Sequence, residues 1–390
     1  MTRVVVAVAV AIVGILACAP AGAVPQMSLL SGAPCSTCHV SPGGGGLRNE
    51  IGWYTAAEWG AITYEDMGLD ALAFESNTFA DGYVAFGYDA RVQWVRAGRP
   101  PATDVLPELI TIPMQIQPGL AVYPLDWLTL YGSYNVGPKT YGGAFCDPHF
   151  DGQECFEAAV LVDADPDYPA LRAGMISPSH GINHDDHTLL YFSSALDHRR
   201  PLLPPNHADL GAELGYQPTS WLRADAGTYL PRNLELAAQA PGLDVDLDPV
   251  SYLGRVSFMP QILDAGLNSW VGVSVYGSGE FRHDIAFLGL GLNDVAALQF
   301  EASRFARAEE SGWSAFVEGT GQVVTWLHLL ARAEVAHAKR GAARREVVQY
   351  VFGAQIFPVP YLELRPEYRL VEVKDEYLLG QVTLQVHQFF

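Results

Sequence analysis

The stretch that decides the fold reads LELRPEYRL over residues 362–370, where apolar and charged side chains alternate. The apolar positions are Leu362, Leu364, Tyr368 and Leu370, and the charged positions are Glu363, Arg365, Glu367 and Arg369. A period of two residues puts the two sets on opposite faces of a β-strand. The same alternation recurs over residues 382–386 and 84–94. The sequence therefore predicts a sheet with one apolar face and one polar face.

Further features favour a membrane barrel over a soluble sandwich. From about Phe79 onward, alternating segments are joined by connections that are short and long in turn. Short turns carry aromatic residues, as at 123–127, whereas long polar connections span 137–154 and 177–207. The terminal Phe389-Phe390 resembles the assembly signal of bacterial outer-membrane barrels, although Gln388 takes a place that is usually apolar. We expect an all-β fold, a transmembrane antiparallel barrel of about 16 strands over residues 79–390.

The amino-acid composition argues against two classes of protein, nucleic-acid-binding proteins and helical membrane proteins. The 390 residues include 43 Asp and Glu against 23 Lys and Arg, a formal net charge of -20. Because so acidic a chain has no basic stripe to neutralise phosphates, we expect no nucleic-acid partner. Charged residues make up 17 %, below the roughly 25 % of a soluble domain. Beyond the N-terminus there is no run of about 18 apolar residues, so we expect no membrane-spanning helix.

Residues 1–23 have the pattern of a secretory signal peptide. Arg3 supplies the positive charge, Val4–Ala17 form the apolar stretch, and Ala21-Gly22-Ala23 provide a small-residue cleavage site. An alternative is a lipoprotein signal with Cys18 as the lipidated residue. Either signal implies export to a compartment where thiols oxidise.

A cysteine motif, Cys35-Ser36-Thr37-Cys38-His39, follows shortly afterwards. In the c-type haem attachment motif, two thiols bond covalently to the haem and the next histidine ligates its iron. We therefore predict one covalent haem c, held by Cys35 and Cys38, with His39 as an axial ligand. One alternative is a structural disulfide beside an idle histidine. The other is half of a zinc site, which needs two further ligands at similar spacing.

The motif belongs to a segment that we place at residues 24–78. Glycines at 43–46 let the backbone lie close to a flat macrocycle, and a helical stretch rich in aromatic residues follows. A flexible linker with anchoring aromatic side chains is the alternative. About 50 residues are too few for a comfortable independent core, so we expect a plug in the barrel lumen. Met67 is a candidate second axial ligand, and Met27 and the later histidines are others.

Two connections carry further candidate residues. Cys146 and Cys155 are expected to form a loop disulfide, although the acidic and histidine side chains between them also suit a metal ion. The densest group of histidine and carboxylate is His180, His184, Asp185, Asp186 and His187. Its position suits a loop folded into the pore as a constriction. A solvated polar loop and a site that captures iron remain alternatives.

Charged residues of both signs are expected on the inner face of the barrel. They are Asp89, Arg91, Glu213, Arg223, Asp225, Arg255, Glu301, Glu318, His328, Arg332, Glu334, Glu363, Arg365, Glu367 and Arg369. Mixed charges on one face are typical of a hydrated, ion-paired lumen. We favour that interpretation over a proton relay.

An exported chain with one haem motif followed directly by a barrel resembles the outer-membrane monohaem cytochrome-porin fusions associated with extracellular iron oxidation. At the level of motifs the match is confined to residues 35–39 and the glycine run. The resemblance implies a protein in the lipid of the Gram-negative cell outer membrane. It would carry electrons between an extracellular donor or acceptor, for which ferrous iron is one candidate, and a periplasmic electron carrier such as a cytochrome.

Two other functions remain open. One is a solute porin whose haem segment is structural or vestigial, and the other is a haem adaptor docked at a barrel mouth. The sequence has no catalytic triad, phosphate-binding loop or hydrolase elbow. Enzymatic activity is therefore considered only as that of an electron-transfer oxidase or reductase, with ferrous iron as one candidate substrate.

Overall fold

A computed structural model describes residues 25–69, 74, 76–98, 109–135, 156–165, 167–182, 184, 189–190, 193–203, 207–239, 243–262 and 265–390. In these ranges an 18-stranded sheet forms, in which β1 (Thr78–Phe79) and β12 (Gln261–Ile262) have two residues each. The remaining strands have seven residues or more. They are β2 (Val84–Ala97), β3 (Leu109–Leu125), β4 (Leu128–Tyr134), β5 (Phe156–Val162), β6 (Ala170–Ile176), β9 (Asp209–Thr219), β10 (Leu222–Leu230), β11 (Ser251–Phe258), β13 (Leu267–Ser278), β14 (Phe281–Leu292), β15 (Ala296–Arg307), β16 (Glu310–Val324), β17 (Leu327–Arg340), β18 (Ala343–Val359), β19 (Leu362–Val373) and β20 (Tyr377–Phe389).

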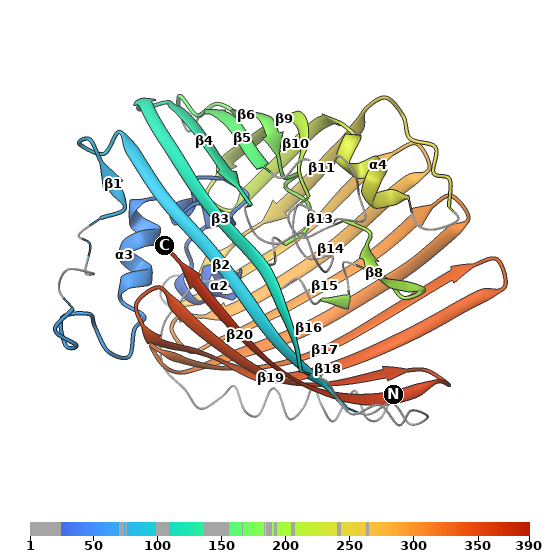
Figure 1. Cartoon of the computed structure of the whole chain (residues 1–390). Helices are drawn as coiled ribbons and strands as arrows, with labels where there is room; N and C mark the ends of the chain where they lie inside the picture. Colours follow the sequence, from blue (N-terminus) through green and yellow to red (C-terminus); the bar gives the residue numbers. More distant parts are fainter. Residues whose placement is uncertain are drawn as a thin grey trace.

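These sixteen strands close into a barrel (Figure 1). Each pairs antiparallel with the next of them along the chain. The ring is completed between β2 and β20, where Asp89 lies opposite Phe389 and Ala97 opposite Gln381. The prediction of an all-β antiparallel barrel of about 16 strands is confirmed. The expected boundary at residues 78 and 79 falls within β1.

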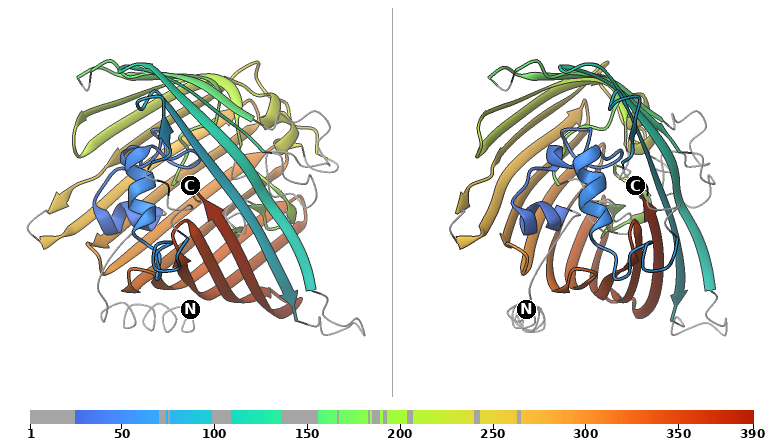
Figure 2. Two further views of the ribbon diagram at one scale, coloured as in Figure 1. Left: turned by 60° about the vertical axis from the view of Figure 1, so that its left-hand side comes forward. Right: turned by 90° about the vertical axis from the view of Figure 1, so that its left-hand side faces the viewer.

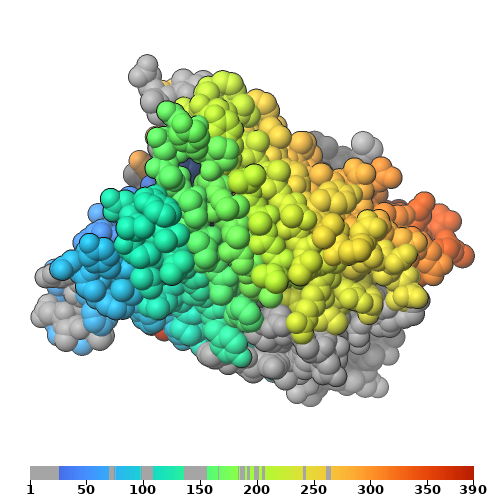
Figure 3. Space-filling view, turned by 90° about the horizontal axis from the view of Figure 1, so that it is seen from above, coloured from blue at the N-terminus to red at the C-terminus, as the bar shows by residue number. Residues whose placement is uncertain are grey.

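The outer surface of the barrel is apolar. Exposed large apolar side chains recur at every second position of the strands, as at Val382 and Leu384 of β20 and at Val271 and Val273 of β13. Strands that follow one another in the chain lie side by side across this surface (Figure 3). An apolar exterior around a polar interior is the arrangement of a barrel that lies in lipid.

Charged side chains face the interior and pair with one another, as the alternation predicts. Arg332 contacts Glu334 at 2.7 Å and Glu318 at 3.0 Å. On β19, Arg365 contacts Glu367 at 2.7 Å. The described lumen is therefore ion-paired, which offsets the cost of holding these charges away from bulk water.

The two rims of the barrel differ in their connections. One rim, here called the turn rim, carries Phe390 and turns with Trp127, Trp221, Trp326 and Tyr361. Aromatic residues at these turns match the girdle expected at a membrane interface. The opposite rim, the loop rim, carries the connections 177–208 and 231–250. The difference gives the barrel a defined polarity.

The N-terminal segment lies inside the barrel at the turn rim. It contains α2 (Pro25–Ser31), the short 3-10 helix η1 (Cys35–Thr37) and α3 (Glu50–Ala57), enclosed by strands in both views of Figure 2. Helix α2 lies against β13, β14 and β15, where Asn268 Nδ2 donates a 2.7 Å hydrogen bond to the carbonyl of Leu29. At the opposite wall, Trp53 and Trp59 pack with apolar residues of the turn rim. Residues 25–59 therefore cross the lumen, and we call them the plug.

A second segment enters the lumen from the loop rim. In the connection 177–203, the backbone N–H of Gly181 donates to Ser274 Oγ at 2.9 Å, and that of Leu190 donates to Glu334 Oε2 at 2.7 Å. The hairpin of β7 (Ser193–Ser194) and β8 (Asp197–Pro201) belongs to the same connection. The described residues thus fold into the pore, as their position in the sequence suggests. We call this segment the lumen loop.

Several predictions fall on other residues. The signal peptide (1–23), Cys146, Cys155, Asp185, Asp186 and His187 lie outside the described residues. Within the described ranges, the helices are too short or too polar to span a membrane.

Candidate cofactor-binding site

The motif Cys35–His39 forms a single tight turn. The backbone N–H groups of Cys38 and His39 both donate to the carbonyl of Cys35, at 3.2 Å and 3.1 Å. Both thiols are free, so the two cysteines do not form the disulfide considered as an alternative. In the described ranges no group of three or more His, Cys, Asp or Glu could hold a metal ion. The zinc alternative therefore lacks its remaining ligands among these residues.

The glycine run closes a small loop beside the motif. His39 pairs with Arg48 in an antiparallel bridge, and the N–H of Val40 donates to the carbonyl of Leu47 at 3.0 Å. Between these pairs, the glycines at 44–46 have φ angles of 79°, 74° and 59°. Residues with side chains rarely adopt this left-handed region. The run of glycines therefore allows the chain to turn back next to His39.

Helix α3 holds the motif from the other side. Asn49 caps the helix, since its Oδ1 accepts from the N–H of Gly52 at 3.0 Å. The amide of the same side chain donates to the carbonyl of Thr37 at 3.0 Å. A Cβ atom at Gly52 would lie only 2.1 Å from the carbonyl oxygen of Cys38. Glycine at position 52 thus permits direct contact between the helix and the motif.

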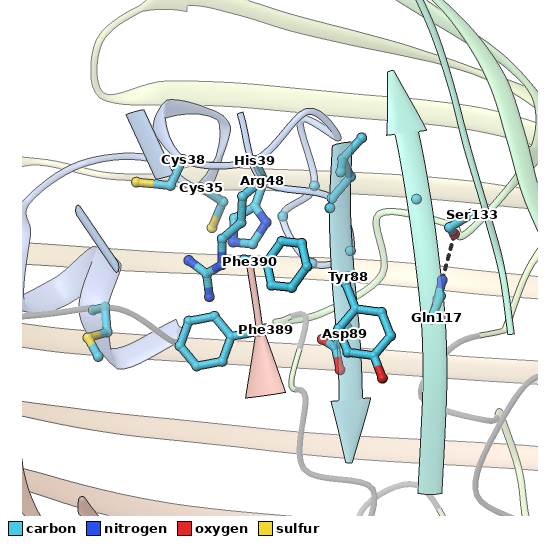
Figure 4. A pocket seen from close by; sticks show the side chains of 18 of the residues that line it. Cys35, Cys38, His39, Arg48, Tyr88, Asp89, Gln117, Ser133, Phe389 and Phe390 are labelled. Carbon is cyan, nitrogen blue, oxygen red and sulfur yellow. Dashed lines mark hydrogen bonds between the residues drawn. The ribbon is translucent and has the colours of Figure 1, made fainter. Parts of the chain in front are cut away.

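A cavity lies between the motif and the barrel wall (Figure 4). Its volume is about 120 Å³. We call it the motif cavity. Its walls include Met27, Cys35, Cys38, His39, the glycines at 43–46 and Arg48 from the plug, and Tyr88, Asp89, Arg91, Gln117, Ser133, His387, Phe389 and Phe390 from the barrel.

Burial controls the protonation of the motif. Burial, followed by the charge of Arg48, lowers the pKa of His39 to about 3. The imidazole is therefore neutral near pH 7, the form that binds a metal. Its Nδ1 has no hydrogen-bond partner in the described part of the chain. Burial also raises the pKa of the Cys35 and Cys38 thiols, which keeps both protonated.

A polar network fastens the plug to the barrel wall. Arg172 Nη1 donates to Ser41 Oγ at 2.9 Å, two residues after His39, and Arg172 Nη2 contacts Glu213 Oε1 at 3.2 Å. Glu213 also accepts from Ser179 Oγ of the lumen loop at 2.6 Å. The sequence predicts that Glu213 faces inward but gives no sign that Arg172 and Ser41 meet. Plug, wall and lumen loop therefore meet at one buried ion pair.

The structure does not bring all the candidate ligands to the motif cavity. Met67 is 40 % exposed and does not line it, whereas Met27 is 1 % exposed and does. His180 and His184 face the lumen wall instead. His180 Nε2 lies 3.2 Å from His283 Nδ1, and His184 Nε2 lies 3.3 Å from Glu301 Oε2.

The motif and its cavity fit a haem c. Two thiols lie on one turn, and a neutral imidazole with an unpartnered nitrogen follows them in the described structure. Aromatic rings and glycines line the cavity, which suits a flat apolar macrocycle. Cys35 and Cys38 would hold the group covalently, and His39 would bind its iron.

Comparisons with known proteins bear on the barrel. No protein-family model matches the sequence, and no curated protein matches it. The outer membrane channel DcaP of Acinetobacter baumannii is similar in structure, with a TM-score of 0.54 and 11 % identity over 79 % of this chain and 97 % of that one. The anion-selective porin from Comamonas acidovorans is also similar, with a TM-score of 0.52 and 12 % identity over 79 % of this chain and 99 % of that one. A loop-deletion mutant of OmpT from Vibrio cholerae has a TM-score of 0.51 and 10 % identity, again over 79 % of this chain and 99 % of that one. At such low identity the likeness establishes a shared fold, that of outer-membrane porins.

Proposed function

We propose that this protein is an outer-membrane barrel that holds one haem c in the motif cavity and carries electrons across the membrane. The observation that supports it is the position of Cys35, Cys38 and His39 at a cavity inside the lumen. A bound haem supplies one-electron exchange. The plug residues attach and orient the group, and the aromatic wall at Phe389 and Phe390 limits its contact with water.

The filled lumen supports passage of electrons rather than solutes. The plug enters from the turn rim and the lumen loop from the loop rim, and they meet where a Cβ at Gly43 would lie 3.1 Å from Ser179 Oγ. A solute would have to pass both segments, whereas an electron needs no open channel. An enclosed redox group therefore explains why a barrel wide enough for a pore contains two inward segments.

The direction of the barrel follows from its rims. Outer-membrane barrels have short periplasmic turns and longer extracellular loops. The turn rim would then face the periplasm, where a cytochrome or another carrier exchanges electrons with the plug. The loop rim would face an extracellular donor or acceptor, for which ferrous iron is one candidate.

A solute porin is the second candidate function, and the comparisons favour it. The similar structures named above are described as a channel and a porin, and the lumen of this chain is lined by paired charges. The third alternative, an adaptor docked at the barrel mouth, has less support because α2 lies against β13, β14 and β15 inside the ring.

Covalent attachment is tested first. The protein is expressed with a haem-maturation system, denatured, separated on a gel and stained for haem peroxidase activity. The wild-type band and the Ser36→Ala control should stain, whereas the double variant Cys35→Ala with Cys38→Ala should lose the stain because neither thioether bond can form. An unstained wild-type band would reject the haem.

Electron passage is tested in proteoliposomes. With an impermeant donor outside, an acceptor enclosed in the vesicles should become reduced only when haem-loaded protein is present. Normal reduction of the haem without reduction of the acceptor would contradict the conduit and favour the solute porin.

A further inference from the structure

Two rows of side chains cross the outer face of the barrel near the loop rim, over strands β14 to β18 (Figure 1). In register, the row nearer that rim contains Arg282, Ala306, Ser311, Lys339 and Arg344. The next row toward the turn rim contains Asp284, Arg304, Trp313, His337 and Glu346. Phe305 and Ala338 alternate with these positions along their strands and are buried, so the two rows face outward. We call Arg304, Lys339 and Arg344 the cationic patch.

The two rows lie at the edge of the apolar surface. The neighbouring row toward the turn rim is uncharged and includes Ala302, Ala315 and Val335. His337 is ten residues beyond Leu327, where β17 begins beside Trp326 of the turn rim. Because a strand rises about 3.4 Å per residue and tilts by about 40°, this distance spans about 26 Å of height, against an apolar band about 25 Å tall. Trp326 and Trp313 therefore mark the two membrane interfaces, and the cationic patch lies at the second.

The cationic patch has no counter-ion of its own. Its three side chains are exposed, and they make no ion pair or hydrogen bond with the described residues. Two carboxylates on the same face pair with other cations, Asp284 with Arg282 at 2.8 Å and Glu346 with Lys374 at 3.5 Å. The chain as a whole has a formal net charge of -20. A local surplus of positive charge on the lipid-facing side of so acidic a protein therefore indicates an anionic partner.

We propose that the cationic patch binds the phosphate groups of a lipid in the leaflet at the loop rim. Lipid headgroups begin where the apolar band ends, which is the height of the patch. Lysine and arginine can lay their apolar stems along the barrel and keep their charges among the headgroups. Each basic residue near a membrane surface strengthens binding to anionic lipid about fivefold, and arginine can donate two hydrogen bonds to one phosphate. The inference stands apart from the proposed function, because no haem takes part in it.

The test measures binding of diphosphoryl lipid A, which carries two phosphate groups, to the folded full chain in detergent. Native mass spectrometry during a lipid titration gives the dissociation constant, and EDTA prevents a metal ion from bridging phosphate to an acidic side chain. A triple variant that replaces the whole cationic patch by glutamine should bind at least about tenfold more weakly than the wild type. The charge-preserving triple variant Arg304→Lys, Lys339→Arg and Arg344→Lys should bind nearly as tightly as the wild type.

Arg345→Met is the matched control, because Arg345 adjoins Arg344 on the opposite face of β18 and pairs with Glu376 at 2.8 Å. It should bind lipid A like the wild type. A change of mobility on boiling confirms that each variant has folded, and if the triple glutamine variant does not fold, Lys339→Gln alone should bind severalfold more weakly.

Three results would overturn the proposal. The first is equally tight binding of lipid A from which both phosphates have been removed. The second is wild-type affinity in the folded glutamine variant. The third is displacement of the lipid by inorganic phosphate, because the patch would then be a site for free phosphate rather than for a lipid.

Discussion

The contact between Gly52 and Cys38 shows how a single missing methyl group positions the motif. Helix α3 begins at Glu50, and its first turn lies directly on the Cys38 carbonyl. Asn49 joins the same two pieces of chain by capping the helix and donating to Thr37. The turn that presents the two thiols is therefore supported by a helix rather than by the cofactor it would carry.

At this scale we predict that Gly52→Ala separates the helix from the motif. The added Cβ would lie 2.1 Å from the carbonyl oxygen of Cys38, and overpacking of this kind costs about 1–3 kcal/mol. Haem staining of the denatured band should fall, while the folded barrel should still resist SDS and change mobility on boiling. Gly254→Ala is the control, because the nearest atom to its Cβ would be 3.6 Å away. Full staining of Gly52→Ala would contradict the role of this contact.

The elements of the barrel show which features a sequence can predict. The alternation over residues 362–370 placed Glu363, Arg365 and Glu367 inside, and all three are buried there. Side-chain alternation depends on neighbouring residues, so it can be read locally. The contact of Arg172 with Ser41 joins residues 131 positions apart, and no local pattern reports it.

The candidate site could be located from the sequence only in part. The spacing of Cys35, Cys38 and His39 predicts a haem attachment motif, and this stays a prediction. The wall opposite the motif is formed by contacts such as that of Leu47 with Gly87, where a Cβ would lie 2.3 Å from Leu47 Cδ1. The sequence does not reveal which distant side chain will pack against a glycine in a strand. For the same reason, nearness along the chain favoured Met67, whereas the fold brings Met27 to the cavity.

At the scale of elements, we predict that the link between plug and wall depends on charge balance. Arg172→Met would leave Glu213 buried without its cation, and breaking a buried ion pair in this way costs about 3–5 kcal/mol. In limited proteolysis of the folded protein, residues 25–69 should be cleaved faster than in the wild type. The double variant Arg172→Met with Glu213→Gln should recover part of the protection, because the uncompensated charge is removed.

A matched control is Arg345→Met, whose partner Glu376 lies at the surface at 2.8 Å. Exposed pairs contribute about 0–1 kcal/mol, so cleavage of residues 25–69 should not change. Equal cleavage in Arg172→Met and the wild type would show that other contacts hold the plug.

The whole molecule combines a porin fold with an interior occupied from both rims. The comparisons establish the first of these features, since the barrel superposes on outer-membrane channels despite very low sequence identity. The second comes from this chain's own contacts, by which α2 reaches Asn268 and the lumen loop reaches Glu334. A shared barrel is compatible with more than one function, so the contents of the lumen distinguish the two candidates.

For the whole molecule, we predict low conductance in planar bilayers. Deleting the plug, residues 25–59, should raise the single-channel conductance severalfold, because only the lumen loop then remains inside the sixteen-stranded barrel. The double variant Cys35→Ala with Cys38→Ala should conduct like the wild type, since it keeps the plug and loses only the attachment. A wild-type conductance equal to that of the deletion would favour the solute porin.

The pairing of β2 with β20 also determines when, during folding, the barrel can close around the motif. β20 follows all the other described strands in the chain, so the ring cannot close until every one of them is available for pairing. During that interval the thiols of Cys35 and Cys38 are not yet surrounded by a barrel. An enzyme too bulky to enter the finished lumen can still reach them then. Any covalent modification of the motif by such an enzyme must therefore be complete before β2 and β20 pair and close the barrel.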